Sequence, residues 1–380
     1  MKIVDVNLFP FSAKRVYSTV TAALGGVAHK EGGYAFSDFA IIELTSDTGI
    51  KGYGEVSDIP ETMTMPNGQN FTIEHLETYL ANQLIGKDPF QIEELLQAYP
   101  EKNMVDIRPD GSMLDIVSCG VDNALLDLIG KTLNVPVYNL FGGKKKDKIW
   151  VSWVVYIRDI KYLEAEIAEK VKEGFDAFKL KVGIDPKQDE ERLRILRETA
   201  GEKAVIKLDA NSGWTFDEAV ENLKRLEKYN PAGIETPIPF LDVEGKAKLK
   251  GRIGMPILEH VHTLEFALEL LKHDAVDVFN ISAAQAGGVF KARKILALAE
   301  SAGKPCLLGS TVECGLGTAS QLHLSAGSSL VTWPSDLIGP KMYVNDMLNA
   351  PHAWDQNRLL VPDGAGFGVE VDPQYLQKGI

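Results

Sequence analysis

From about Lys148 onward, short apolar segments alternate with longer amphipathic ones. VSWVVYI, AFKLKVG, AVIKLDAN, GIETPI, PILEH, VFNIS and PCLLGS have the length and apolar content of buried strands. Helix-like segments such as DEERLRILRETAG lie between them. Seven strands with helices between them predict a parallel barrel or a doubly wound sheet. No G-x-G-x-x-G follows a strand, so the dinucleotide-binding doubly wound fold has no support and a barrel is favoured.

The first hundred or so residues have a different layout. Strand-like patterns at Ile3 to Phe9 and Phe36 to Thr45 precede a turn, a third strand and two helical patterns. A glycine-rich stretch over 22–36 and a segment ending at Asn70 are expected to be loops. We therefore predict an N-terminal α+β domain over residues 1–125, completed by about 351–380, and a barrel domain over 126–350.

Charge and cysteine content exclude several classes of protein. The 380 residues include 40 basic and 53 acidic side chains, for a net charge of −13. Nucleic acids and anionic membranes both favour positive patches, so neither is expected as a partner. The three cysteines form no C-x-x-C pair and no apolar run approaches the roughly 20 residues of a membrane helix. We expect a cytoplasmic protein without disulfides.

Polar residues stand at the carboxyl ends of successive predicted strands. Asp209, Glu235 and Glu259 end the third, fourth and fifth of them, at spacings of 26 and 24 residues. In a barrel this places all three at the mouth, where the chemistry of such folds occurs. Converging carboxylates repel one another unless a cation lies among them, and hard oxygen ligands favour Mg²⁺ or Mn²⁺ over zinc.

Two lysines interrupt the preceding apolar strand. Lys179 and Lys181 are two residues apart, so they lie on the same face of that strand. Lysines are usually solvated, but this segment is otherwise apolar. A buried lysine beside a cation is a plausible base near neutral pH.

Longer segments then carry a family resemblance. GFDAFKLKVG, KLDANSGW, GIETPIP, TVECGLGTASQLHLSAG, DLIGP and VPDGAGFGVEVD resemble the enolase superfamily, in its muconate-lactonizing enzyme/mandelate racemase branch. The resemblance covers essentially the whole chain. It implies an α/β fold, with a modified (β/α)₇β TIM-like barrel and an N-terminal α+β capping domain.

The resemblance also implies roles for individual residues. Asp209, Glu235 and Glu259 are expected to hold Mg²⁺ or Mn²⁺, with Lys181 as acid/base catalyst and Lys179 as its electrostatic helper. Glu313 matches the carboxylic acid that hydrogen-bonds the carboxylate of the substrate. The stretch 22–36 matches a mobile lid that sets specificity. The candidate substrate-binding residues are Asn211, His260, Tyr156 and His29.

The chain departs from the family pattern on its sixth barrel strand. Ser282 stands five residues before Gly287-Gly288, where muconate-lactonizing relatives carry a second lysine. A serine hydroxyl is a poor base without an activating partner. We therefore favour one-base chemistry on a small carboxylate by Lys181, as a lyase (syn β-elimination or dehydration) or a cycloisomerase. Ser282 or Tyr156 relaying a proton through water would instead allow a racemase or epimerase of an amino-acid derivative or dipeptide.

A second departure concerns the fifth strand, which ends Leu258-Glu259-His260. Glu259 is assigned as the metal ligand there because it is the only carboxylate at that strand end. A barrel that binds metal and ligand without catalysis is the alternative from another class of protein. The resemblance also implies a homo-oligomer, either a dimer or an octamer.

Overall fold

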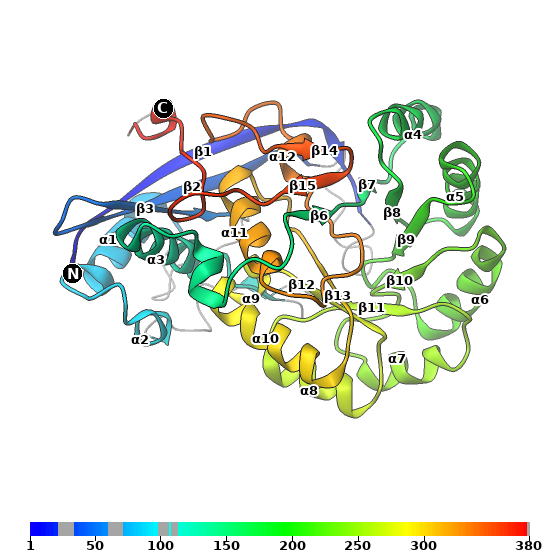
Figure 1. Cartoon of the computed structure of the whole chain (residues 1–380). Helices are drawn as coiled ribbons and strands as arrows, with labels where there is room; N and C mark the ends of the chain where they lie inside the picture. The colour runs from blue at the N-terminus through cyan, green and yellow to red at the C-terminus, as the bar shows by residue number, and fades with distance from the viewer. Residues whose placement is uncertain (22–33, 60–70, 98–105, 108–112, 378–380) are drawn as a thin grey trace.

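The computed structural model describes residues 1–21, 34–59, 71–97, 106–107 and 113–377. Most of the predicted lid, including His29, and the 61–70 loop lie outside the described residues. Figure 1 shows the chain as two packed parts, an N-terminal sheet with its helices and a barrel ringed by helices. One continuous buried apolar cluster runs through both parts, from Ile42 and Leu125 to Leu208.

The N-terminal part is an antiparallel sheet in the order β1-β2-β3. Its strands are longer than the sequence patterns indicated, because the polar ends continue the pairing of β1 with β2. The elements of this part are β1 (Ile3–Thr19), β2 (Tyr34–Ser46), β3 (Lys51–Val56), α1 (Ile73–Leu84), α2 (Ile92–Gln97), the short pair β4 (Asp106–Ile107) and β5 (Met113–Leu114), and α3 (Ile116–Leu133).

Helix α3 packs unusually close to β3. A Cβ added to Gly54 would lie 1.9 Å from the carbonyl oxygen of Gly120, so only glycine allows this approach. The same helix contacts the C-terminal tail, since Asp127 accepts hydrogen bonds from the backbone N–H of Tyr53 at 2.9 Å and of Phe367 at 3.0 Å. The predicted domain boundary at residue 125 therefore falls inside one buried helix.

Seven parallel strands form the sheet of the barrel, paired in chain order from β7 to β13. They are β7 (Trp153–Val155), β8 (Ala177–Lys181), β9 (Val205–Asp209), β10 (Gly233–Glu235), β11 (Ile257–His260), β12 (Val278–Ile281) and β13 (Cys306–Leu308). Every residue of β8 is buried, as expected of strands covered on both faces.

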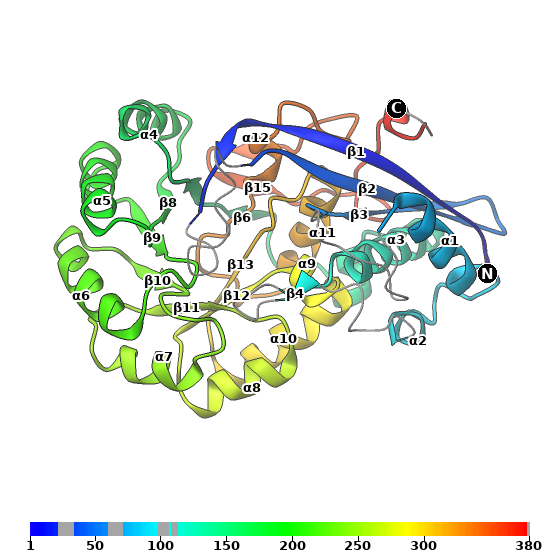
Figure 2. The same ribbon diagram turned by 180° about the vertical axis from the view of Figure 1, so that it is seen from behind.

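Residues 331–336 occupy the eighth position of the barrel. Val331 forms a parallel bridge to Cys306 of β13, and Ser335 forms another to Val151, just before β7. The ring is thereby closed through single bridges instead of a regular strand. This arrangement confirms the predicted modified barrel with its N-terminal capping domain, seen from behind in Figure 2.

Helices follow the barrel strands and cover the outside of the sheet (Figure 1). They are α4 (Leu163–Lys172), α5 (Pro186–Ala200), α6 (Phe216–Leu226), α7 (Val243–Lys250), α8 (Leu264–Lys272), α9 (Ala283–Ala286), α10 (Val289–Ala302) and α11 (Gly315–Ala326), with 3-10 turns Ile160–Tyr162 and Glu227–Tyr229. Their starts follow local capping rules. Thr215 and Glu218 form a capping box at α6, and Asp185 caps α5 before Pro186.

The C-terminal segment returns along the barrel to the N-terminal part. The small antiparallel sheet β14-β15-β6 pairs this segment with the chain just before β7. The three strands of this small sheet are β6 (Lys148–Trp150), β14 (Trp354–Asp355) and β15 (Arg358–Leu360). The remaining elements of the described chain are α12 (Gly339–Met342) and the 3-10 turns Val137–Phe141 and Pro373–Tyr375. The N-terminus and the turn Pro373–Tyr375, close to the last described residue, lie beside the N-terminal sheet (Figures 1 and 2).

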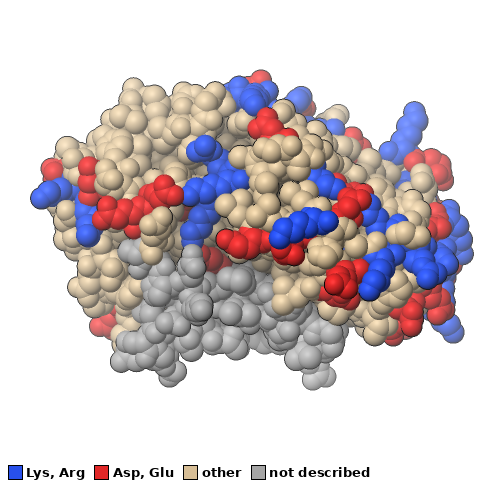
Figure 3. All heavy atoms as spheres, turned by 90° about the horizontal axis from the view of Figure 1, so that it is seen from below, with Lys and Arg blue, Asp and Glu red and all other residues tan. Residues whose placement is uncertain are grey.

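The described surface mixes charges of both signs. On the face seen in Figure 3, Lys and Arg side chains lie next to Asp and Glu side chains over the part that is drawn in colour. In the ranges that the structure describes, no helix is long and apolar enough to cross a membrane.

Candidate active site

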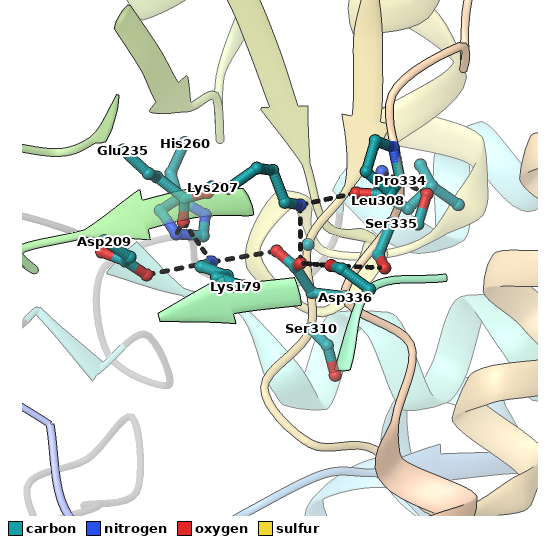
Figure 4. Close-up of polar contacts among 12 residues, drawn as sticks. Lys179, Lys207, Asp209, Glu235, His260, Leu308, Ser310, Pro334, Ser335 and Asp336 are labelled. Atoms are coloured by element: carbon teal, nitrogen blue, oxygen red, sulfur yellow. Dashed lines mark hydrogen bonds and ion pairs between the residues drawn. The ribbon is translucent and has the colours of Figure 1, made fainter. Parts of the chain in front are cut away.

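The centre of the site is the ammonium group of Lys179 on β8. Its Nζ lies 2.9 Å from Asp209 Oδ2, 2.6 Å from Glu235 Oε1 and 2.9 Å from Asp336 Oδ2. Figure 4 shows this lysine surrounded by the three carboxylates, which come from β9, β10 and the segment that closes the barrel. Lys179, Asp209 and Glu235, which the sequence analysis placed together, are therefore in contact.

Lys181 lies one pleat further along the same strand. Its Nζ is 2.6 Å from Asp209 Oδ2 and 3.0 Å from Asn211 Oδ1. Asn211 has a positive φ of 44°, a conformation that asparagine tolerates better than most residues, and its backbone N–H donates to Asp209 Oδ1 at 3.0 Å. The end of β9 and the turn that follows it therefore supply the two acceptors of the Lys181 ammonium, Asp209 and Asn211.

Opposite charges dominate the electrostatics of this cluster. Burial by itself would raise the pKa of Asp209, but Lys179 and Lys181 hold that pKa well below its ordinary value. Burial would likewise lower the pKa of Lys179, and the charges of Asp209, Asp336 and Glu235 raise it well above its ordinary value instead. The three carboxylates therefore favour the charged form of Lys179, which suits the predicted electrostatic role.

Beneath this cluster, a further buried lysine contacts Asp336. Lys207 Nζ lies 2.8 Å from Asp336 Oδ1 and donates to the carbonyl oxygen of Pro334 at 2.5 Å. Ser152 Oγ donates to the same carboxylate oxygen at 2.8 Å. The chain that closes the barrel is therefore tied to β9 and to the residue before β7 by one carboxylate.

Glu259, which was expected beside the other two carboxylates, is paired instead with residues on the helix side of β11, and its role as a metal ligand stays a prediction. Its Oε2 lies 3.0 Å from Nζ of Lys246 on α7, and its Oε1 accepts from Thr236 Oγ1 at 2.5 Å. Successive side chains of a strand point to opposite faces. Glu259 takes the face towards the helices, and its neighbour His260 takes the face towards Glu235.

His260 therefore stands where the third carboxylate was expected. Its Nε2 lies 2.9 Å from Glu235 Oε1, and its Nδ1 lies 2.9 Å from Oε1 of Gln285 on α9. Figure 4 shows the ring beside Glu235 and Lys179. As the side chains lie, no three or more His, Cys, Asp or Glu of the described ranges form a group that could hold a metal ion. The ammonium groups of Lys179 and Lys181 instead form ion pairs with Glu235 Oε1 and Asp209 Oδ2.

Glu313 lies in the loop between β13 and α11 and is buried. Its Oε1 accepts from the backbone N–H of Thr311 at 3.0 Å and from Gln321 Nε2 at 3.2 Å, and Ser310 Oγ donates to its other oxygen. Burial raises the pKa of Glu313, although these hydrogen bonds oppose the rise. Gln321 also accepts from the backbone N–H of Ala283, next to Ser282. Glu313 is thereby connected to the end of β12.

The other predicted residues are distributed around the barrel mouth. Ser282 follows β12 and is fully buried, and its Oγ has no hydrogen-bond partner in the part of the chain described. Tyr156 follows β7; burial raises its pKa to about 12, and its ring contacts Tyr17 of β1 edge to face. Strands β8 and β12 are separated by three others in the sheet order, so Lys181 and Ser282 stand on different sides of the mouth.

Sequence reasoning missed four residues of this site. Lys207 carried a signal, because it stands two residues before Asp209 on an apolar strand and so shares its face. The other three are contributed by segments outside the strands, and nothing local marked them: Lys246, Gln285 and Asp336.

Fold and site together define a modified parallel barrel with a cluster of buried charged side chains at the carboxyl ends of its strands, which is where barrel enzymes carry out their chemistry. The family model described as "Enolase C-terminal domain-like" matches residues 162–375, and the one described as "Mandelate racemase / muconate lactonizing enzyme, N-terminal domain" matches residues 30–142. The chain belongs to this branch of the enolase superfamily, which confirms the resemblance and the expectation of an enzyme.

Relatives within the family differ in the reactions for which they are named. The N-succinyl-L-Arg/Lys racemase of Bacillus cereus is 29% identical over 91% of this chain and 91% of its own length. Its crystal structure superposes with a TM-score of 0.87 over 100% of this chain and 98% of that one, at 27% identity. The hydrophobic dipeptide epimerase of Enterococcus faecalis is 30% identical over 87% of this chain and 89% of its length. The chloromuconate cycloisomerase of Pseudomonas putida is 28% identical over 89% of this chain and 90% of its own.

Proposed function

We propose that this protein is a divalent-metal-dependent enzyme in which Lys181 removes the α-proton of a small carboxylate substrate. The observation that carries the proposal is the position of the Lys181 ammonium, 2.6 Å from Asp209 Oδ2 and 3.0 Å from Asn211 Oδ1 at the barrel mouth. Lys181 ends a barrel strand, and barrel enzymes carry out their chemistry at the carboxyl ends of their strands.

Asp209 and Glu235 fit the proposed metal ion, which we expect to be Mg²⁺ or Mn²⁺. Glu235 Oε2 is buried and has no hydrogen-bond partner among the described residues, so it has a free position for a cation. A crystal structure of the dipeptide epimerase from Enterococcus faecalis, with a TM-score of 0.83 to this chain, is titled as a complex with Mg and the dipeptide L-Leu-L-Tyr. When bound, the cation would stabilise the negative charge that develops on the substrate carboxylate.

Each of the other proposed site residues has a separate role in the reaction. Lys181 takes the α-proton, and Asn211 and Asp209 hold its side-chain nitrogen in place. Lys179 contributes a fixed positive charge to the site. Glu313, whose pKa is raised by burial, is suited to donate a hydrogen bond from its neutral form to the substrate carboxylate. Asn211 and Tyr156 are the proposed substrate contacts.

We favour a lyase or cycloisomerase because Ser282 is the residue at the second-base position. In a syn elimination, Lys181 takes the α-proton and returns it to the β-leaving group on the same face, so that water leaves and a double bond forms. In cycloisomerisation, a carboxylate oxygen of the substrate adds to a double bond to close the ring, and the Lys181 ammonium gives one proton to the α-carbon of the resulting enolate. Ring opening is the reverse: Lys181 removes that α-proton, and the ring C–O bond breaks to release the carboxylate. Neither reaction needs a base on the side of Ser282.

A second candidate is a racemase or epimerase of an amino-acid derivative or dipeptide. It is favoured by the names of the Bacillus cereus and Enterococcus faecalis relatives. Inversion requires a proton donor on the face opposite Lys181. Ser282 or Tyr156 would have to deliver that proton through water, because a hydroxyl alone is a weak acid and a weak base.

Replacing the proposed base tests the function directly. Acid sugars, N-acyl amino acids, dipeptides, proline derivatives and muconates are screened in D₂O with Mg²⁺ or Mn²⁺, and products are followed by proton NMR. Lys181→Ala should lower turnover by about a hundredfold or more. The matched control Lys187→Ala alters an exposed lysine near the start of α5 and should leave turnover unchanged.

The product distinguishes the candidates. Loss of water or ring formation supports the one-base reaction, whereas deuterium at the α-position with inversion supports the epimerase. Full activity of Lys181→Ala would refute the assignment of the base. Tight binding of an acid without any turnover or α-proton exchange would support the alternative of a barrel that binds but does not catalyse.

A further inference from the structure

The loop that carries Glu313 contains a strained residue. Val312 has a φ of 67°, in the left-handed region that β-branched side chains rarely adopt because they crowd the backbone there. Val312 and Thr236 are the only β-branched residues with a positive φ in the part of the chain that the structure describes, and both lie in segments that follow barrel strands. Strain of this kind persists only where the surrounding contacts impose it, and it is concentrated at functional sites.

The turn at Val312 folds the side chain of Glu313 back onto the residues before it. Glu313 Oε1 accepts from the backbone N–H of Thr311 at 3.0 Å and from the hydroxyl of Thr311 at 3.2 Å. Ser310 Oγ accepts from the N–H of Val312 at 2.8 Å and donates to the other carboxyl oxygen of Glu313. The carbonyl oxygen of Glu313 packs so close to Gly339 that a Cβ added there would lie 1.7 Å from it. The direction of the Glu313 carboxyl group therefore depends on the backbone conformation of Val312.

The hydroxyl of Tyr343 holds the carbonyl group of Val312. Tyr343 Oη lies 2.8 Å from the carbonyl oxygen of Val312 and 3.1 Å from Ser37 Oγ. A carbonyl oxygen only accepts, so the single hydroxyl hydrogen of Tyr343 goes to Val312, which leaves the tyrosine oxygen to accept from Ser37. Burial raises the pKa of Tyr343 well above its ordinary value, so this donor stays protonated.

Tyr343 is itself anchored on the capping domain. It forms an antiparallel bridge with Arg15 of β1, and its ring packs edge to face against Phe39 of β2 at a centroid distance of 5.5 Å. Arg15 donates to Ser37 Oγ from Nε at 3.0 Å and from Nη2 at 2.6 Å. A chain of hydrogen bonds therefore runs from β1 and β2 through Tyr343 to the loop that carries Glu313.

We propose that Tyr343 is a positioning residue for Glu313, because its hydroxyl holds Val312 in the left-handed conformation that directs the Glu313 carboxyl group at the substrate carboxylate. The inference rests on the proposed function, since the contact between Glu313 and the substrate belongs to that function. The capping domain thereby contributes to the site through β1 and β2 themselves.

Urea unfolding of the full-length protein tests the strain without reference to activity. Val312→Ala and Val312→Gly both remove the valine side chain, but only glycine adopts a φ near 67° without strain. Val312→Gly should therefore unfold at a higher urea concentration than Val312→Ala, although glycine is ordinarily the less stable of the two. In the Tyr343→Phe background the ordinary order should return, because the released carbonyl group lets the loop relax.

Two results of the urea experiment would overturn the inference. A higher midpoint for Val312→Ala than for Val312→Gly, with Tyr343 present, would show that position 312 is not strained. An advantage of glycine that persists in the Tyr343→Phe background would show that contacts other than the tyrosine hydroxyl hold the strained conformation.

A double-mutant cycle with Glu313 tests the positioning role. The substrate is the acid with the fastest Lys181-dependent turnover in the screen described above, and kcat and KM are measured for wild type, Tyr343→Phe, Glu313→Ala and the double variant. Tyr343→Phe should lower kcat/KM by about ten- to a hundredfold, because a misplaced group loses much of its effect. In the Glu313→Ala background the same substitution should cost less than about twofold, because no carboxyl group remains to be positioned.

Tyr138→Phe is the matched control. It removes a tyrosine hydroxyl that donates to Asp363 at 2.6 Å in the C-terminal segment. This variant should lose stability as Tyr343→Phe does, because each loses one hydroxyl hydrogen bond, but it should keep the kcat/KM of the wild type.

The kinetic outcomes separate this inference from the proposed function. Equal losses of kcat/KM on Tyr343→Phe in both backgrounds would make Tyr343 a merely stabilising residue and overturn the inference, while Lys181-dependent turnover would leave the proposed function intact. Full activity of Lys181→Ala would refute the proposed base, but coupling between Tyr343 and Glu313 would still support the positioning role.

Discussion

The ion pair between Glu259 and Lys246 offers a sharp test of which way the fifth barrel strand faces. Both side chains are fully buried, and Glu259 Oε2 lies 3.0 Å from Lys246 Nζ. The substitution Glu259→Gln retains an oxygen for the hydrogen bonds from Thr236 Oγ1 and from the backbone N–H of His260. It therefore removes the charge and little else.

The expected cost is large because Lys246 would keep a buried charge. Its ammonium would then keep the carbonyl oxygens of Pro239 and Phe240 and the face of the Phe240 ring as neighbours, none of which carries a negative charge. Removing one partner of a buried ion pair destabilises a protein by about 3–5 kcal/mol. Lys246→Met should cost a similar amount, and the double variant should recover about 1–3 kcal/mol of the summed loss, since the two residues are coupled.

Urea unfolding followed by tryptophan fluorescence measures these free energies. The experiment is done at pH 8, because burial raises the pKa of Glu259 even though Lys246 opposes the rise. Mn²⁺ affinity is measured on the same samples. An unchanged stability of Glu259→Gln, combined with a lost metal site, would show that this carboxylate faces the barrel interior and would refute the reasoning.

Three further predictions concern pH, packing and the support of Lys179. His323 is buried and its pKa is lowered from 6.5 to about 4, chiefly by burial. Unfolding therefore takes up a proton between these pH values, and stability present above pH 6.5 should fall by about 3 kcal/mol as the pH drops to 4. Denaturant unfolding of His323→Gln should show a flatter pH dependence, and parallel curves would contradict the assignment. Gly54→Ala should cost at least about 1–3 kcal/mol of unfolding free energy, because its Cβ would meet the Gly120 carbonyl at 1.9 Å; an unchanged urea midpoint would disprove this close packing. Asp336→Asn should lower stability by about 3–5 kcal/mol, because Lys179 and Lys207 lose a shared partner, and a neutral result would show that the pair is satisfied otherwise.

Much of the fold was readable from the sequence because the signals were local. Alternating apolar strands and amphipathic helices depend on the residues of each segment, so they predicted the barrel and its order. Lys179 and Lys181 share a face because they are two residues apart on one strand, and this holds whatever the strand packs against. Asp209 and Glu235 were also predicted from local patterns, because each residue ends its own apolar strand and the carboxyl ends of neighbouring parallel strands lie at the same edge of the sheet.

The composition of the site was a different matter. Whether Glu259 or His260 faces the barrel depends on the register of β11 against β10 and β12, and a shift of one residue exchanges the two faces. The strand was too short for its apolar pattern to decide this. Lys246, Gln285 and Asp336 approach from a helix, a short turn of helix and the segment that closes the barrel, so no sequence spacing brings them to the site.

The sequence by itself therefore determined the barrel, the capping domain and the lysine and carboxylates that end β8, β9 and β10. Those features follow from periodicity within single segments. Only the tertiary structure decided that Glu259 pairs with Lys246 and that His260 joins Glu235. Side chains from distant segments compete for each buried charge, and that competition is settled only when the segments pack together.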